Sequence, residues 1–215
     1  MKDHLDKLLC TKFPEMMVNR TKPMMETCMC WGFECGDGWF NILDQLMSNI
    51  QHHIDWKEKQ RKWAIDYNEM AAQAKAGNFD LFEEANKSLT NEEYKNERLA
   101  EIIARDFRQV PESIPQVTLD QVKEKFGSLR FYYTGGDDVI DGMVRMAESM
   151  TEVTCEQCGH PGEQRHGGWI KTLCDPCVTA REAERAKQLA EYESKKETKN
   201  ELNYQYVGED SGQYD

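Results

Sequence analysis

The stretch QVKEKFGSLRFYYT, Gln121 to Thr134, marks the place where the hydrophobic period of the chain changes from 3.6 residues to 2. In its second half, Leu129, Phe131 and Tyr133 fall on one face, and more polar residues fall on the other. The KEKFG sequence between the two halves supplies a turn. This stretch therefore predicts a β-hairpin, in a chain whose other long segments have the helical period.

The first strand of this hairpin begins a few residues before the quoted stretch. Strict alternation places Val117, Leu119 and Gln121 together on one face of that strand. After the hairpin, the sequence GGDD turns the chain into a helix whose apolar residues continue to Met150. The segment after the PESIP loop is thus a hairpin followed by a helix.

The first 110 residues are expected to be mostly helical. Apolar residues recur at spacings of three and four from Trp39 onward and predict one amphipathic helix that continues to Ala74, before a stop at Gly77. The sequence from Thr90 to Glu93 matches a capping box, which marks the start of another helix. Further helices are expected over residues 4–13 and 81–85.

The expected fold class is therefore α+β, with a mostly helical N-terminal part. The boundaries that we predict are 1–110 for a helical region with a patch rich in cysteine, tryptophan and glycine, 111–150 for the hairpin plus helix, 151–180 for a zinc-binding module, and 181–215 for an exposed charged helix with an acidic disordered tail.

The zinc-binding module is predicted from two Cys-x-x-Cys pairs, in TCEQCGHPG from Thr154 and TLCDPC from Thr172. Their separation is within the range of four-cysteine structural zinc sites, and the residues between them suggest a short hairpin, as in zinc-ribbon or treble-clef modules. Asp175-Pro176 favours a helix start at the second pair. We expect one structural Zn²⁺ whose ligands are Cys155, Cys158, Cys174 and Cys177.

A structural zinc site of this kind is closed by four protein ligands and leaves no position for a substrate. His160 and His166 are alternative ligands, but four cysteines already complete the site. Because the carboxylates of residues 151–180 outnumber the basic residues, we expect this zinc to build structure rather than to read phosphates.

The chain after Cys177 has alternating charges, many alanines and few apolar residues, which is typical of a solvent-exposed helix. The last residues, NYQYVGEDSGQYD, are acidic and have the composition of a disordered tail.

Composition restricts the class of partner. The chain carries 27 lysines and arginines against 39 aspartates and glutamates, which gives a net charge of −12 and disfavours nucleic acid as a partner. No window has the roughly 18 consecutive apolar residues of a membrane span, and the N-terminus does not resemble a signal peptide. We therefore expect a cytoplasmic protein without a membrane partner, in which the eight cysteines are thiols or metal ligands rather than disulfides.

Three further cysteines, Cys28, Cys30 and Cys35, lie close together in the sequence. Their C-x-C-x4-C spacing is not that of a standard zinc knuckle. One interpretation is a second metal site, and the other is a set of buried thiols that pack as small apolar groups.

Candidate catalytic residues are few. Gln121-Val122-Lys123 on a predicted strand is similar to an element of some metal-dependent nucleases, in which carboxylates hold a divalent ion. Glu34 and Asp37 would be the carboxylates, nominated by elimination, with Lys123 as the cationic residue. The alternative is that all three are ordinary solvated residues, with Asp37 as a helix cap.

Candidate binding residues combine aromatic and basic side chains, because tryptophan, tyrosine and arginine dominate protein interfaces. Lys123, Lys125 and Arg130 beside tyrosines would form a basic stripe for nucleic acid. The alternative for the tryptophans is burial in the core. The candidate contact residues are Trp31, Trp39, Lys125, Arg130 and Tyr132.

Three blocks together resemble a family of uncharacterised proteins encoded by tailed bacteriophages and prophages: GFECGDGWFNILDQL, QVKEKFGSLRFYYTGGDD, and TCEQCGHPG with GWIKTLCDPC. They cover about half of the chain. Members of the family often have Cys-x-x-His where this chain ends its second pair with Cys177, an exchange that a zinc ligand allows. The resemblance implies a phage origin but no established activity.

Three functions remain open at this stage. The first is an accessory protein that binds and modulates a host, defence or phage protein, on a platform made by the zinc module and the hairpin. The second is a nucleic-acid-associated zinc protein, and the third is a metal-dependent nuclease. The acidic charge and the closed zinc site favour the first, because no hydrolase triad, P-loop or dinucleotide motif is present in the sequence.

Overall fold

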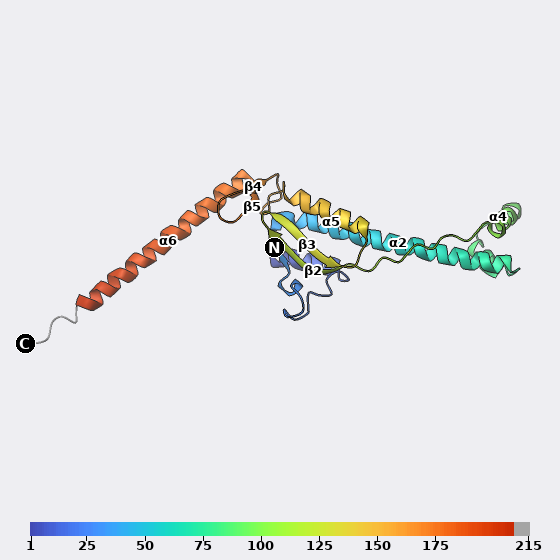
Figure 1. Ribbon diagram of the computed structural model, residues 1–215, viewed down its shortest axis with the longest axis horizontal. Helices are drawn as coiled ribbons and strands as arrows, with labels where there is room; N and C mark the ends of the chain where they lie inside the picture. The colour runs from blue at the N-terminus through green and yellow to red at the C-terminus, as the bar shows by residue number, and fades with distance from the viewer. Residues whose placement is uncertain (209–215) are drawn as a thin grey trace, which may run out of the picture.

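A computed structural model of the protein describes the backbone of residues 1–208 and the side chains of residues 1–196. The elements form a central body from which two long helices project to opposite sides (Figure 1). Helix α2, Phe40–Lys75, begins in the body and continues far beyond it. Helix α6, Asp175–Gly208, leaves the body in the other direction.

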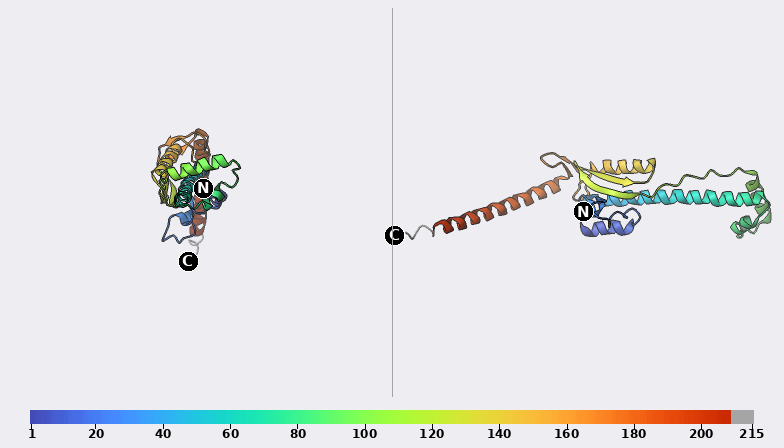
Figure 2. Two further views of the ribbon diagram at one scale, coloured as in Figure 1. Left: turned by 90° about the vertical axis from the view of Figure 1, so that its right-hand side faces the viewer. Right: turned by 60° about the horizontal axis from the view of Figure 1, so that its bottom comes forward.

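The body is built on a three-stranded sheet in the order β1-β2-β3. β2 (Thr118–Lys125) and β3 (Ser128–Thr134) form the expected antiparallel hairpin. β1 (Phe33–Glu34) pairs in parallel with the outer side of β2. Helix α5 (Asp138–Thr151) follows the hairpin and lies along both α2 and β3, as Figure 2 also shows.

The alternation predicted for the first strand of the hairpin is wrong beyond Leu119. The register shifts between Leu119 and Gln121, so that Asp120 is an extra residue in β2, a β-bulge. Val122 is therefore buried in place of Gln121, which is only half-buried. By the same change of parity, the side chain of Glu124 lies on the inner side and is only 7% exposed.

Three hydrogen bonds hold the bulge. The Asp120 carboxylate accepts a hydrogen bond from Thr134 Oγ1 at 2.8 Å and one from Asn19 Nδ2 at 3.3 Å. The Asn19 amide also donates to the carbonyl of Leu119 at 2.8 Å. The segment that follows helix α1 (Asp3–Lys12) is thereby fixed to the edge of the hairpin.

The main core lies between the inner face of the sheet and helices α1, α2 and α5. It includes Leu9 of α1, the N-terminal half of α2, and apolar residues from every strand of the sheet. Two short 3-10 helices, η1 (Met29–Trp31) and η2 (Asp37–Trp39), lie on either side of β1 and add Met29 and Trp39 to this core.

The far half of α2 carries a small second lobe, which we call the distal lobe, residues 64–104. Helices α3 (Asp80–Ala85) and α4 (Glu92–Ala104) fold back against α2 there. The apolar centre of the lobe is small, and its buried residues are Ala71, Ala74, Phe82 and Ile102.

Helix α4 differs in detail from the sequence expectation. Its N-cap is Asn91, whose side-chain oxygen accepts from Tyr94 N at 3.1 Å, and not Thr90. Asparagine and threonine both cap helices, and the capping box places the cap only one residue too early.

An extended segment, residues 105–117, returns from the distal lobe to the sheet along α2. Asn68 exchanges two hydrogen bonds with the backbone of Arg108, of 2.7 and 2.8 Å, and Arg61 donates to the carbonyl of Pro111 at 2.8 Å. Closer to the body, Gln51 and Gln116 bond through their side-chain amides at 3.0 Å. These contacts tie the returning chain to α2 at several points along its length.

The C-terminal part contains a two-stranded sheet, β4 (Glu163–Arg165) with β5 (Lys171–Leu173), which leads directly into α6. The exposed charged helix predicted after Cys177 is confirmed. It extends further than expected, because residues 203–208 continue α6 where the sequence indicates a disordered tail. The rest of that predicted tail, residues 209–215, lies outside the described residues.

The α+β fold class predicted from the sequence is confirmed. Among the helices that the structure describes, none combines the length and the apolar character needed to cross a membrane.

Candidate metal centre

Four cysteine sulfurs meet where the two Cys-x-x-Cys pairs come together. Their Sγ atoms all lie within 4.8 Å of one another, and those of Cys158 and Cys174 are 3.5 Å apart. Sulfurs bound tetrahedrally to one zinc ion at about 2.3 Å would be separated by about 3.8 Å. The four cysteines therefore form a group that could bind a metal ion, at the positions predicted from the sequence.

Local backbone structure explains why each pair points inward. In the first pair, Cys155 N donates to the carbonyl of His160 at 2.7 Å, and Gly159 N donates to the carbonyl of Cys155 at 2.9 Å. Gly159 has φ 78°, a conformation that a glycine adopts without strain. The second pair lies across the first turn of α6, where Cys177 N donates to the carbonyl of Cys174 at 3.1 Å.

The thiols differ in how readily they lose a proton. Burial alone would raise the pKa of the Cys155 thiol. Hydrogen bonds from the backbone N–H groups of Cys174, Cys158 and Gln157 outweigh that effect and lower this pKa to about 7. At Cys177, burial and the neighbouring sulfurs raise the pKa. A divalent cation removes the repulsion between thiolates, so binding of a metal and loss of protons are coupled.

The cluster is attached to the body by the glycine-rich segment before α2. Gly38 N donates to the backbone carbonyl of Glu156 at 2.8 Å, and Gly36 N donates to the Glu156 carboxylate at 3.0 Å. A Cβ on Gly38 would lie 2.3 Å from the carbonyl oxygen of Cys155, so only glycine fits there. The indole of Trp39, fully buried, donates to the carbonyl of Thr154 at 2.9 Å.

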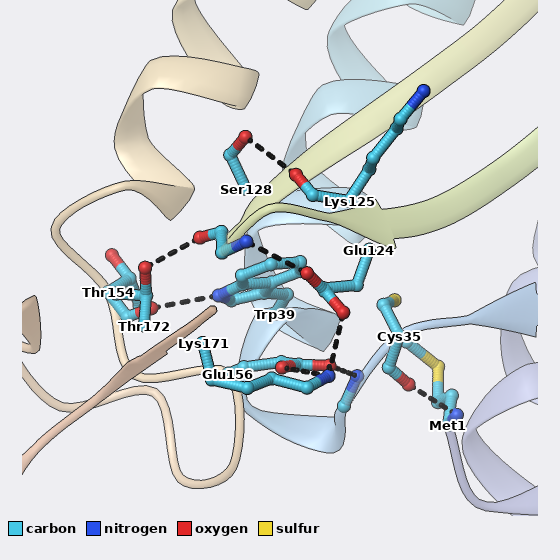
Figure 3. A network of polar contacts seen from close by, with 12 residues as sticks. Met1, Cys35, Trp39, Glu124, Lys125, Ser128, Thr154, Glu156, Lys171 and Thr172 are labelled. Atoms are coloured by element: carbon cyan, nitrogen blue, oxygen red, sulfur yellow. Dashed lines mark hydrogen bonds and ion pairs between the residues drawn. The ribbon is translucent and has the colours of Figure 1, made fainter. Parts of the chain in front are cut away.

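A half-buried lysine joins the cluster to the hairpin (Figure 3). Lys171 Nζ lies 2.8 Å from a carboxylate oxygen of Glu124 and 2.8 Å from one of Glu156. Burial alone would lower the pKa of Lys171 and raise that of Glu124. The ion pairs outweigh burial, so the pKa of Lys171 is raised and that of Glu124 is lowered. One ammonium thus pairs with two carboxylates whose side chains are less than 10% exposed.

The turn of the β2–β3 hairpin completes this attachment. Thr172 Oγ1 donates to the carbonyl of Gly127 at 2.5 Å, and Leu129 N donates to Thr151 Oγ1 at 2.9 Å. Residues 151–177 therefore pack against η2 and the hairpin through buried polar contacts. The four-cysteine cluster is part of the body rather than a module on a linker.

The nuclease candidates are not brought together around a metal site. The Asp37 carboxylate is bound to the backbone N–H of Lys2 at 2.8 Å and to its ammonium at 3.0 Å. Glu34 accepts from Gln121 Nε2 at 3.2 Å, and the Lys123 ammonium lies 5.6 Å from the centre of the Tyr132 ring. Within the described residues, the four-cysteine cluster is the one group of three or more His, Cys, Asp or Glu side chains placed to hold a metal.

The candidate contact residues separate into two groups. Trp39 is fully buried, so the prediction that it lies on a contact surface is wrong, and the alternative of a core tryptophan holds for it. Trp31 is 63% exposed and Tyr132 is 45% exposed. Lys125 and Arg130 lie on the outer face of the hairpin, where Lys123 is directly opposite Arg130. Their role in binding stays a prediction.

The three cysteines near the N-terminus do not behave as one group. Cys35 is buried, and burial raises the pKa of its thiol to about 12. Its carbonyl accepts a hydrogen bond from the amino group of Met1 (Figure 3). Cys30 is half-buried, and Cys28 is exposed. The interpretation as a set of buried thiols therefore fits Cys35 but not Cys28.

Sequence reasoning missed the residues that attach the metal centre to the body. These are Gly36, Gly38, Glu124, Glu156 and Lys171. The available signal was the pair of glycines two positions apart in CGDGW, because a glycine outside a hairpin turn often marks a close backbone approach. The inward position of Glu124 depends on the bulge at Asp120, which alternation alone does not reveal.

Comparisons with known proteins found no counterpart: no protein-family model, no curated protein and no solved structure matches this chain.

Proposed function

We propose that the protein is a phage-encoded accessory protein that holds one structural zinc ion and binds a partner protein in a groove between α2 and α5. The apolar lining of this groove, on the surface of a highly charged chain, is the observation that carries the proposal. Of all residues in the chain, 31% are charged, yet none of those that line the groove is.

Zinc is proposed from the donor set. Four cysteine sulfurs suit soft or borderline metals, and a site with four protein ligands and no open position is typical of structural zinc. The contacts of Gly38, Trp39 and Lys171 support a structural role, because they connect the cysteine-bearing loops to the sheet and to α2. Elemental analysis of the purified protein should give one zinc per chain, and a protein without bound metal would contradict this part.

The groove has a volume of about 420 Å³ and runs between two helices. Ile42 and Leu46 of α2 form one side of its floor, and Ala147 of α5 the other. Two exposed methionines of α5 stand beside it, Met146 at 67% and Met150 at 45% exposure. The rim on α2 is made by three amide side chains spaced four residues apart, Asn41, Gln45 and Asn49.

The occupant that fits this geometry is an amphipathic helix of the partner. Helices bind in apolar grooves through residues spaced three and four apart, and flexible methionines adapt to such a surface. Helix α5 has 14 residues and is about 21 Å long, which matches about four turns of a bound helix. Because the whole chain has a net charge of −12, basic residues at the edges of the partner helix would strengthen binding.

The class of the partner follows from the proposed origin. The three sequence blocks that resemble phage and prophage proteins support a protein made in the cytoplasm of a bacterial host. A host protein, a defence protein or another phage protein is then the partner class. Affinity purification from bacteria that carry the phage, followed by mass spectrometry, supplies candidates.

Two variants decide whether a candidate binds in the groove. Met146→Glu places a charge among apolar groups and should weaken binding of the purified partner at least about tenfold, measured by calorimetry. Met25→Glu is the matched control, because Met25 is 89% exposed and does not line the groove. A partner that binds both variants as well as it binds the unaltered chain would contradict the groove as its site.

A further inference from the structure

A second cleft lies between the β4–β5 hairpin and the first turns of α6. It has a volume of about 440 Å³ and shares no residue with the groove between α2 and α5. The charge of its lining is opposite to that of the whole chain. The lining contains one carboxylate, that of Glu182, and four cationic side chains, those of Arg165, Lys171, Arg181 and Arg185.

Two of these arginines are free to bind a ligand. Arg181 and Arg185 are four residues apart on α6 and therefore lie on the same side of the helix. Neither makes an ion pair with any residue whose side chain the structure describes. Arg165 is held in place by Asp175 at 2.6 Å and by the carbonyl of Leu173 at 3.1 Å, and Lys171 is taken by its two carboxylates.

An exposed tryptophan completes the cleft. Trp169 lies in the loop between β4 and β5, and its side chain is 75% exposed although tryptophan is highly buried on average. It follows Gly167 and Gly168, both with positive φ and with open space around them. The loop thus carries a broad aromatic surface beside two unpaired guanidinium groups.

We propose that this cleft binds a short segment of single-stranded nucleic acid, with Arg181 and Arg185 on successive phosphates and a base stacked on Trp169. Arginine presents a planar fork that matches phosphate oxygens, and base stacking on aromatic side chains is the common device of single-strand binding. A duplex is disfavoured, because its dense charge meets a protein with a net charge of −12. An acidic peptide would pair with the arginines but leaves the indole without a ring to stack on.

The test uses the full chain and a fluorescein-labelled hexamer of deoxythymidine, with binding measured by fluorescence anisotropy. Two phosphate contacts predict that log K falls with log salt concentration with a slope of about −1.4. Trp169→Ala should weaken binding at least about fivefold, and Trp169→Phe should retain most of it. Arg181→Glu with Arg185→Glu should weaken binding more than about tenfold.

The matched control is Arg98→Glu with Arg105→Glu, which changes the net charge equally in helix α4 and at its C-cap, far from β4 and β5 in Figure 1. This variant should bind the hexamer nearly as the unaltered chain does. Equal losses in both double variants would show that only global charge matters and would overturn the proposal. It would also be overturned by absence of binding at low salt, or by stronger binding of a glutamate-rich peptide at the same cleft. Loss of binding only in Lys125→Ala with Arg130→Ala would move the site to the hairpin face.

Discussion

The body and the distal lobe are connected by one helix but are held together in different ways. The body joins segments that are far apart in the sequence, since Gly38 contacts Glu156, and Gly127 contacts Thr172. The distal lobe is built from neighbouring segments around four buried apolar side chains. A protein can thus combine a part held together by long-range polar contacts with a part built from neighbouring segments around a small apolar centre.

This comparison predicts that the two parts lose their structure independently. Closing the long loops of the body carries an entropic cost, which the proposed metal ion and the buried contacts must offset. The distal lobe closes shorter loops but buries little apolar area, so it should open more often than the body. Four perturbations, taken from the largest expected effect to the smallest, test this separation.

Removal of the metal should have the largest effect, and it should fall on the body. Cys158→Ser leaves three thiols, and structural zinc sites in isolated peptides contribute roughly 10–16 kcal/mol. We expect loss of bound zinc and a loss of stability above about 5 kcal/mol, with faster hydrogen exchange in residues 154–177 and at the start of α2. Cys28→Ser, at an exposed thiol outside the cluster, is the control and should keep its zinc. A Cys158→Ser protein that still binds one zinc would contradict the assigned ligands.

Truncation of the distal lobe's largest buried side chain should act on that lobe alone. Phe82 is 1% exposed, and a buried Phe→Ala change costs about 3–5 kcal/mol. Hydrogen exchange should accelerate in α3, α4 and the far half of α2, while zinc content and the exchange of the β2–β3 hairpin stay unchanged. If the body loses protection to the same extent, the two parts form one cooperative unit and the comparison fails. Leu81→Ala, at a 37% exposed neighbour, is the control.

A single methyl group at Gly38 tests the attachment of the metal centre to the body. The added Cβ would meet backbone atoms of Cys155, Cys158 and Gly159 at 2.3–2.7 Å, none of which can rotate away. We expect Gly38→Ala to cost about 1–3 kcal/mol and to weaken zinc retention against a chelator. Gly142→Ala, on helix α5 with nothing within 4 Å, should instead stabilise the protein by about 0.5–1 kcal/mol. Equal stability of the two variants in urea would exclude the close contact.

The ion pair of Lys171 should contribute the smallest and most pH-dependent effect. Because the pKa of Glu124 is lowered from 4.5 in the folded state, its contribution is present above pH 4.5 and is lost as the pH falls through the folded value. Glu124→Gln should therefore cost about 1–2 kcal/mol near pH 7, and the difference from the unaltered chain should shrink below pH 4.5. Urea titrations of both proteins from pH 3 to pH 7 measure it. A difference that does not change with pH would show that Glu124 carries no charge at neutral pH.

The sequence was sufficient to predict the elements whose signal is periodic. The apolar spacing from Trp39 to Ala74 predicts helix α2 almost to the residue, and alternation from Leu129 to Tyr133 predicts β3. The spacing of the Cys-x-x-Cys pairs predicts which four sulfurs meet. In each case neighbours along the chain carry the information, so one sequence is enough.

What the sequence could not predict depends on contacts between distant segments. The bulge at Asp120 is fixed by Asn19, about a hundred positions earlier in the chain, and it determines that Glu124 faces Lys171. Tryptophan is a typical interface residue, but Trp39 packs in the main core and donates to the carbonyl of Thr154. Likewise, the sequence does not show that the arginines of α6 line one cleft together with Trp169 of the hairpin loop.

Helix α2 also determines a distance. Its 36 residues span about 54 Å. The returning segment is hydrogen-bonded to it at Asn68 and Arg61, so the distal lobe stays at a fixed distance from the four-cysteine cluster. The helix acts as a molecular ruler. Seven residues inserted after Lys59, with matching length in the returning segment, would move the lobe outward by about 10 Å with a rotation of only about 20°. Two inserted residues would shift it by about 3 Å and turn it to nearly the opposite side. An assembly that contacts both ends of this protein would tolerate the small rotation caused by seven residues but not the change in length. It would tolerate the small change in length caused by two residues but not the rotation.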